Sequence, residues 1–156
     1  MKILYFDAFS LFYSREYIRN DKEISHAYQE WRNASTFNLF KVVTPDLAAI
    51  ERLRCAAIES GFMLYPLGNK YTRTLFIESG LFAENELAPD VTLKIRLDDT
   101  DPIRMMIAHA YELNASWYVC GDCGPDLVNE RYLASNWNFG VTDELLSKIR
   151  ALNNIC

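Results

Sequence analysis

Hydrophobic positions in this chain follow two alternating patterns, short continuous runs and longer stripes at helical spacing. Continuous apolar runs, which are typical of strands buried on both faces, occupy residues 3–6, 62–67 and 116–120. Helices are expected, from apolar spacing or from the capping and turn residues that bound them, over residues 21–31, 44–61, 71–78, 103–113 and 142–152. Because strands and helices alternate, the pattern predicts an α/β fold with a mainly parallel sheet and right-handed crossovers.

Two weaker patterns predict shorter strands. Apolar and polar residues alternate over 91–96 and again over 137–141, and the first of these stretches fits a strand with one face in water. Loop or irregular structure is expected at residues 8–14, 33–43 and 81–90. Residues 8–43 together are interpreted as a small cap or insertion at the end of the first strand.

Length and composition limit the kinds of protein that this chain can be. Its 156 residues fit one domain, 1–156, and 50% hydrophobic with 24% charged residues is an ordinary globular composition. No apolar run reaches the length of a membrane span, and the short apolar run after Lys2 stops at Asp7, which is unlike a signal peptide. We therefore expect a cytoplasmic protein with no membrane partner.

Charge argues against an extended nucleic-acid interface. The formal net charge is -5, and Lys and Arg gather in no stripe along the chain. A short or single-stranded nucleic-acid end remains open as a substrate, and so does a phosphorylated small molecule. The oligomeric state is left open by the sequence.

The cysteines are too few and too scattered for a disulfide-stapled secreted domain. Cys120 and Cys123 form a C-x-x-C pair, but no second pair accompanies it, and the two histidines, His26 and His109, stand alone, so a zinc site is not indicated. We interpret the pair as incidental. A thiol redox protein that uses these two cysteines is the remaining alternative.

Two of the strongest strand patterns lead into acids. Asp7 directly follows the first run, and Asp122 and Asp126 follow the third. The carboxyl ends of parallel strands line the ligand crevice of an open α/β sheet, although Asp7 could instead cap a following helix. If the two strands are neighbours, the three carboxylates repel one another unless a cation lies between them, and Mg²⁺ prefers such oxygen ligands.

These acids lie in motifs that resemble the haloacid-dehalogenase-like (HAD-like) superfamily. Its first strand ends in a nucleophilic Asp, as at Asp7, and its fourth motif is a strand ending in G-D-x-x-x-D, which residues 121–126 match as GDCGPD. The layout looks most like the small, minimally capped phosphatase domains of RNA-repair enzymes. The resemblance covers most of the chain and implies a Rossmann-like three-layer sandwich with helices on both faces and a minimal cap.

The same resemblance implies a chemistry. Asp7 would attack phosphorus to form an aspartyl-phosphate, which divides one displacement into two easier ones. Asp122 and Asp126 would hold Mg²⁺ together with Asp7. Arg96 or Lys94 would neutralise the phosphate oxygens, and Arg96 is the first choice because its guanidinium presents a planar fork. The implied substrate is a nucleotide, a nucleic-acid end or another phosphate ester.

Three positions depart from the pattern of the phosphatases in this family. Phe9 stands where they carry a general acid and base, the end of the second strand offers Tyr65 in place of Ser or Thr, and Ser10 or Leu11 replaces the first loop's glycine. Dehalogenase relatives lack the same acid, but the chain is short for their larger cap. Two functions follow: a metal-dependent phosphohydrolase with impaired motifs, or a catalytically inactive HAD-like protein that binds a ligand or partner.

Overall fold

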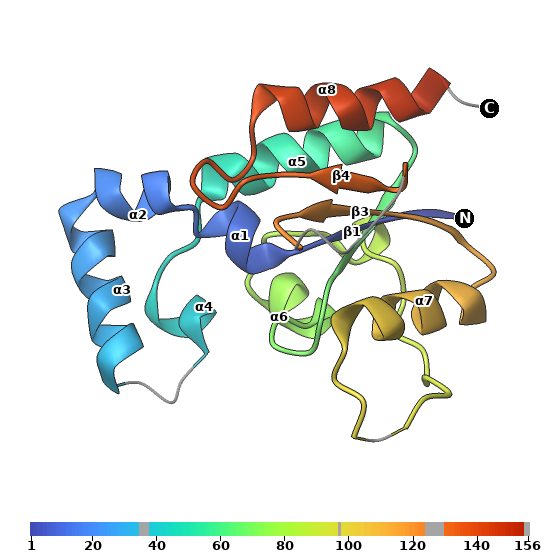
Figure 1. The fold of residues 1–156 in the computed structure, drawn as a ribbon, viewed down its shortest axis with the longest axis horizontal. Coiled ribbons are helices and arrows are strands. Elements are labelled where there is room, and N and C mark those ends of the chain that lie inside the picture. Colours follow the sequence, from blue (N-terminus) through green and yellow to red (C-terminus); the bar gives the residue numbers. More distant parts are fainter. Residues whose placement is uncertain (35–37, 97, 124–129, 155–156) are drawn as a thin grey trace.

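The sheet is the frame of the molecule. The computed structural model describes residues 1–34, 38–96, 98–123 and 130–154 (Figure 1). In these ranges the protein is a mixed α/β structure with an all-parallel sheet in the order β2-β1-β3-β4. Its strands are β1 (Lys2–Phe6), β2 (Met63–Pro66), β3 (Ser116–Gly121) and β4 (Tyr132–Ala134). The predicted α/β class and parallel sheet are confirmed.

Helices fill most of the chain between the strands. They are α1 (Ala8–Phe12), α2 (Arg15–Asn20), α3 (Lys22–Ala34), α4 (Leu39–Val42), α5 (Leu47–Glu59), α6 (Arg73–Glu78), α7 (Pro102–Glu112) and α8 (Asp143–Ala151), with 3₁₀ turns η1 (Glu84–Glu86) and η2 (Leu152–Asn154). In Figure 1, α5 and α8 lie together above the strands, and α7 lies below them. The helices α2, α3 and α4 project to the left, beyond the end of β1.

The alternation of side chains along β1 separates two apolar cores. Leu4 and Phe6 belong to the larger core, which also contains the buried faces of α5 and α8. Ile3 and Tyr5 point into the smaller one, with Met106 of α7. Each of these four β1 side chains is at most 1% exposed, as expected for a central strand covered on both faces.

Side-chain caps begin the longer helices that cover the sheet. Thr142 accepts a hydrogen bond from the backbone N–H of Leu145 at the start of α8, as its position in the sequence predicts. Asp101 caps α7, whose first residue is Pro102. The cap of α5 is Asp46 and not the expected Thr44, so this helix begins later than predicted. Within the described ranges, no helix combines the length and apolar character needed to cross a membrane.

Both weak strand predictions are wrong. Residues 91–96 form a loop, and Val91 and Leu93 line a small pocket against α7, which explains their apolar spacing. The edge of β2 that faces away from β1 is instead paired at one position, where Leu64 forms a parallel bridge with Leu87. The fourth strand is β4 and not 137–141, where Phe139 is 58% exposed.

Residues 8–14, expected to be irregular, contain the short helix α1. Most of its side chains are buried, and α1 contacts α5 and β3. The whole stretch 8–43 connects β1 to α5 and contains α1, α2, α3 and α4. Packing therefore orders α1, whose five residues are too few to show a helical pattern in the sequence, whereas α3 confirms the helix expected over 21–31.

Candidate functional site

Asp7 and Asp122 leave neighbouring strands at the same edge of the sheet. Phe6 is paired with Cys120, and the backbone N–H of Asp7 donates to the Cys120 carbonyl at 3.0 Å. The chains approach so closely that a Cβ on Gly121 would lie 2.7 Å from the Cβ of Asp7, and Gly121 has a φ of +130°. Only glycine suits this position, because it lacks the atom that would collide.

Ser10 connects the two acids. Its hydroxyl donates to Oδ2 of Asp7 at 2.6 Å and accepts the backbone N–H of Asp122 at 3.0 Å. Ser10 is 3% exposed and lies in α1, the helix that Asp7 caps. The capping role considered for Asp7 and its place beside Asp122 are therefore both present in the structure.

Asp7, Ser10 and Asp122 together form what we call the Asp7 corner. Burial is the main influence on its electrostatics. It raises the pKa of the Asp7 carboxyl above its ordinary value, the two hydrogen bonds from Ser10 act in the opposite direction, and the charge of Asp122 raises the pKa further. Asp122 is exposed, and its Oδ2 accepts the backbone N–H of Trp137 at 3.1 Å. Asp126, the third predicted metal ligand, lies outside the described residues.

The donor set of this corner fits a magnesium ion in part. Oδ1 of Asp7 and Oδ1 of Asp122 accept no hydrogen bond from the described residues, so each acid has one oxygen available. Mg²⁺ is commonly held by one or two carboxylates and completes its shell with water and substrate phosphate. Within the described ranges, no group of three or more His, Cys, Asp or Glu side chains could hold a metal by itself.

Asp7 also lines a large cleft. Its volume is about 1120 Å³, and it lies between the α3–α4 side of the molecule and the segment 67–71 with the start of α7. Aromatic side chains line much of it: Phe9, Tyr28, Trp31 and Tyr71. The cations on its wall are Arg32, from α3, and Lys70, from the loop after β2. Sequence reasoning did not select these two cations, because nothing in their local pattern places them near Asp7.

The cations chosen from the sequence lie elsewhere on the surface. Lys94 and Arg96 are in the loop before α7, and each side chain is 84% exposed. Arg96 pairs with Asp98, and Lys94 approaches Glu112. Neither lines the Asp7 cleft in this structure. Their selection depended on a strand at 91–96 that the chain does not form.

Two of the positions that depart from the phosphatase pattern, Phe9 and Tyr65, have other contacts in the structure. Phe9 packs between Tyr13 and Trp137, with ring centroids 6.3 and 5.5 Å away, so the position expected to carry an acid is part of an aromatic cluster. The hydroxyl of Tyr65 donates to Asp90 and does not line the Asp7 cleft. The end of β2 therefore brings no hydroxyl to the cleft, which is lined instead by the residues that follow the strand, from Leu67 onward.

The C-x-x-C pair lies at this corner but has the wrong chemistry for thiol exchange. Cys120 is fully buried in β3, and burial raises its pKa. Burial, together with the charges of Asp7 and Asp122, raises the pKa of Cys123 to about 12. Since the thiolate is the reactive form, these cysteines are poorly suited to redox chemistry at neutral pH.

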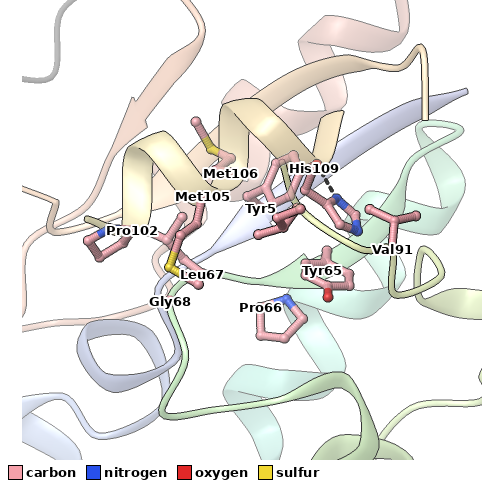
Figure 2. Close-up of a pocket in the computed structure, with 11 residues that line it drawn as sticks. Tyr5, Tyr65, Pro66, Leu67, Gly68, Val91, Pro102, Met105, Met106 and His109 are labelled. Atoms are coloured by element: carbon pink, nitrogen blue, oxygen red, sulfur yellow. Dashed lines mark hydrogen bonds between the residues drawn. The ribbon is translucent and has the colours of Figure 1, made fainter. Parts of the chain in front are cut away.

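A second pocket lies on the face of the sheet that α7 covers (Figure 2). It is small, about 70 Å³, and is bordered by Tyr5, Tyr65 and His109 among mainly apolar side chains. His109 Nε2 donates to the Pro89 carbonyl at 2.8 Å, because a carbonyl can only accept, so Nδ1 accepts the Tyr5 hydroxyl at 2.7 Å. Burial lowers the pKa of His109, which agrees with this neutral form. His109 is thus a packed residue.

Comparisons with protein-family models, with curated proteins and with solved structures found no match to this chain.

Proposed function

We propose that the Asp7 cleft binds phosphate monoesters with Mg²⁺ and hydrolyses them slowly. The observation that carries this proposal is the convergence of Asp7 and Asp122 from neighbouring strand ends, joined by the buried hydroxyl of Ser10. We extend it to the fold and propose a HAD-like, Rossmann-like three-layer arrangement in which residues 8–43 form a minimal cap. The HAD-like resemblance of residues 121–126 and the cations on the cleft wall support the same chemistry.

Asp7 is the nucleophile in this proposal. Its Oδ1, which accepts no hydrogen bond from the described residues, forms a bond to phosphorus while the bond from phosphorus to the ester oxygen breaks. The leaving oxygen takes its proton from solvent water. A second water then attacks the phosphorus of the aspartyl-phosphate and loses a proton to solvent, which releases inorganic phosphate and restores the carboxylate. Ser10 holds the other oxygen, so the carboxylate cannot rotate freely during either step.

Charge compensation comes from the cleft wall and the bound cation. Mg²⁺, held by Oδ1 of Asp122 and by the Asp7 oxygen that does not attack phosphorus, would neutralise phosphate charge. Arg32 and Lys70 offer further positive charge from two different elements. Phe9 supplies no proton to the leaving oxygen, and the loss of a positioned acid typically lowers the rate by a factor of about 100 to 10,000. We therefore expect a slow enzyme.

A second function has its own support. Phe9 belongs to an aromatic cluster where the family's phosphatases carry an acid, so the same cleft is also suited to binding a phosphate ester without turnover. A catalytically inactive protein of this kind would retain the charge complementarity of the site. The two functions differ only in whether phosphate is released.

The test measures release of inorganic phosphate from ribose 5-phosphate and glycerol phosphate in the presence of Mg²⁺. We expect slow release by the natural chain and none above background by Asp7→Asn. Asp98→Asn is the matched control, because that carboxylate lies away from the cleft and should leave the rate unchanged.

Equal background from the natural chain and Asp7→Asn would reject hydrolysis. The melting temperature then decides whether binding remains, because a ligand that binds only the native state stabilises it. An increase with Mg²⁺ and phosphate ester would support the binding function. An unchanged melting temperature would reject both functions.

A further inference from the structure

We propose that Tyr132 is a positioning residue, which holds the loop that carries Asp122 so that this acid can bind a cation together with Asp7. The inference rests on the proposed function, because it concerns the same site. It differs from that function in what it explains, since it addresses the binding of the metal and not the release of phosphate.

The hydroxyl of Tyr132 joins the two residues on either side of Asp122. It donates to the Gly121 carbonyl at 2.8 Å and accepts the backbone N–H of Cys123 at 2.9 Å. A carbonyl can only accept and a backbone N–H can only donate, so the direction of both bonds is fixed. Burial raises the pKa of Tyr132, so the phenol keeps the proton that it donates at neutral pH.

The position of Tyr132 on β4 explains how its hydroxyl reaches the loop. Tyr132 pairs with Val119, whereas Gly121 pairs with Ala134, two residues later. The phenol therefore spans the length of two residues along the sheet, which a short serine or threonine side chain cannot do. Its ring packs against the smaller core, so the hydroxyl belongs to an ordered side chain.

The loop is also held from the opposite face of the sheet. Ser10 accepts the backbone N–H of Asp122 at 3.0 Å, and it lies in α1, whose apolar side chains belong to the larger core. The backbone N–H of Trp137 donates to Oδ2 of Asp122 at 3.1 Å. The backbone around Asp122 and one of its oxygens are therefore fixed, and Oδ1 is left unengaged by the described residues.

This arrangement matters because Asp122 is exposed. An exposed carboxylate on an unrestrained loop samples many orientations, and binding a cation would require all of this freedom to be lost. The bonds from Tyr132 restrict the loop before the cation binds. Both bonds go to backbone groups, so Tyr132 acts through the loop and is a positioning residue, not a metal ligand.

Binding of Mn²⁺ tests the inference directly, because Mn²⁺ takes the same oxygen ligands as Mg²⁺ and loses its sharp EPR spectrum when it is bound. Competition with Mg²⁺ then gives the affinity for Mg²⁺. Other carboxylates of an acidic protein also attract divalent ions, so the site is defined as the binding that Asp122→Asn removes.

Tyr132→Phe keeps the ring and removes only the hydroxyl. The Gly121 carbonyl retains its bond from the backbone N–H of Ser135 at 3.0 Å, so β3 and β4 should remain paired and the variant should fold. The Cys123 N–H loses its partner, and the loop gains freedom. We expect the Asp122-dependent affinity for both ions to fall about 10- to 100-fold, the usual effect of losing a group that orients a metal ligand.

Tyr5→Phe is the matched control. It also removes one phenol hydroxyl of the smaller core, which donates to Nδ1 of His109 on α7 at 2.7 Å and not to the loop with Asp122. The variant should lose stability and keep the Asp122-dependent affinity. The melting temperatures of the two variants show whether their structural costs are similar.

Phosphate release gives a second readout that a purely structural role would not produce. In Tyr132→Phe, the Mg²⁺ concentration that gives half the maximal rate should rise by the same factor as the loss of affinity. The maximal rate should stay close to that of the natural chain. A structural defect would instead lower the maximal rate together with the fraction of folded protein.

Equal Mn²⁺ affinity of the natural chain and Tyr132→Phe, an equal loss in Tyr5→Phe, or no Asp122-dependent binding at all would overturn the inference. The proposed hydrolysis fails separately, when no ester loses phosphate in an Asp7-dependent way. Tyr132-dependent metal binding without hydrolysis would support the positioning role and reject the enzyme. Asp7-dependent hydrolysis with a metal affinity that does not depend on Tyr132 would do the reverse.

Discussion

Two regions that begin only two residues apart on the chain show what separates a structural polar network from a candidate functional site. Tyr5 points from β1 into the pocket of His109 (Figure 2), and Asp7 follows the end of the same strand. Both regions bury an ionisable side chain, and in both cases burial displaces its pKa toward the neutral form. Burial and a displaced pKa therefore do not by themselves identify a functional residue.

The regions differ in how their hydrogen-bonding capacity is used. Both nitrogens of His109 are bonded within the fold, one to Tyr5 and one to Pro89. At the other corner, Asp7 and Asp122 each keep one oxygen that no described residue engages. The first pocket holds about 70 Å³, whereas the cleft at Asp7 holds about 1120 Å³. Unused oxygens beside an open cleft, and not burial, point to ligand chemistry.

The largest effect is expected from Gly121→Ala, which should disrupt only the Asp7 corner. Its Cβ would lie 2.7 Å from that of Asp7 and 3.2 Å from the Ser10 hydroxyl, at a φ of +130°. Backbone strain and overpacking typically cost about 1–3 kcal/mol each, so we expect a loss of about 3 kcal/mol or more in the free energy of unfolding.

Gly80→Ala is the control for Gly121→Ala, because that glycine also has a positive φ but nothing lies within 4 Å of the added Cβ. It should cost about 1 kcal/mol, from the backbone conformation alone. Denaturant unfolding measures the free energy of unfolding of both variants. Equal losses from the two variants would show that the close approach of the two strands at Asp7 is not present in solution.

Replacing His109 with Leu tests the closed network and should cost about 2 kcal/mol or more, because it leaves the Tyr5 hydroxyl and the Pro89 carbonyl without their partner. The effect depends on pH. The pKa of His109 is lowered in the fold, so its stabilising contribution is present above the unfolded pKa of about 6.5 and is lost as the pH falls.

His26→Leu is the control for the pH dependence, because His26 is exposed and pairs with Glu30 on the same helix. Urea unfolding from pH 7.5 to pH 5 should give a steep loss of stability for the natural chain and for His26→Leu. His109→Leu should lose part of this slope. An unchanged slope in His109→Leu would mean that another group is responsible for it.

Ser10→Ala should have a moderate effect on stability and a specific one on the site. The variant removes a buried hydrogen bond to a carboxylate, which typically contributes about 1.5–3 kcal/mol. It also removes one of the two hydrogen bonds that lower the pKa of Asp7, the bond from the hydroxyl, so that pKa should rise further. The acidic limb of the pH profile for phosphate release should move to higher pH.

Ser14→Ala separates the two consequences of Ser10→Ala. Ser14 is equally buried and caps α2, so its loss should cost about 1 kcal/mol. It touches neither acid and should leave the pH profile in place. If both serine variants shift the profile alike, Ser10 does not act through Asp7.

The sequence predicted those parts of the fold in which one residue pattern has one structural cause. Continuous apolar runs gave β1, β2 and β3, because side chains of central strands are buried on both faces. The alternations at 91–96 and 137–141 have a different origin. Val91 borders a pocket, and Trp137 packs against Phe9, so isolated packing contacts produced the spacing that is typical of a strand.

The residues of the site also divide into those that the sequence predicted and those that it did not. Asp7 and Asp122 were recognisable because each comes just after a run that only a buried strand explains. Arg32 and Lys70 were not, because helix α3 and the loop after β2 meet at the cleft only through tertiary packing. Ser10 carried a weak signal, since a hydroxyl three residues after a capping Asp can reach its carboxylate.

The smallest expected effect on stability comes from Asp7→Asn, and its sign is the most informative. The pKa of Asp7 is raised in the fold, so its charged form destabilises the native state, and stability is lost as the pH rises through the folded pKa. Asn keeps an acceptor for Ser10 without the charge. The variant should therefore unfold at a slightly higher temperature than the natural chain at pH 7, and the difference should disappear near pH 3, where both side chains are neutral.

Asp99→Asn is the control of opposite sign, because the Asp101 backbone and Arg104 lower the pKa of Asp99, and its loss should not stabilise the protein at pH 7. A lower melting temperature for Asp7→Asn at pH 7 would mean that the Asp7 charge is compensated within the fold, as it is at a structural ion pair. A higher one, together with lost phosphate release, would show that the chain keeps a destabilising carboxylate because the ligand requires it.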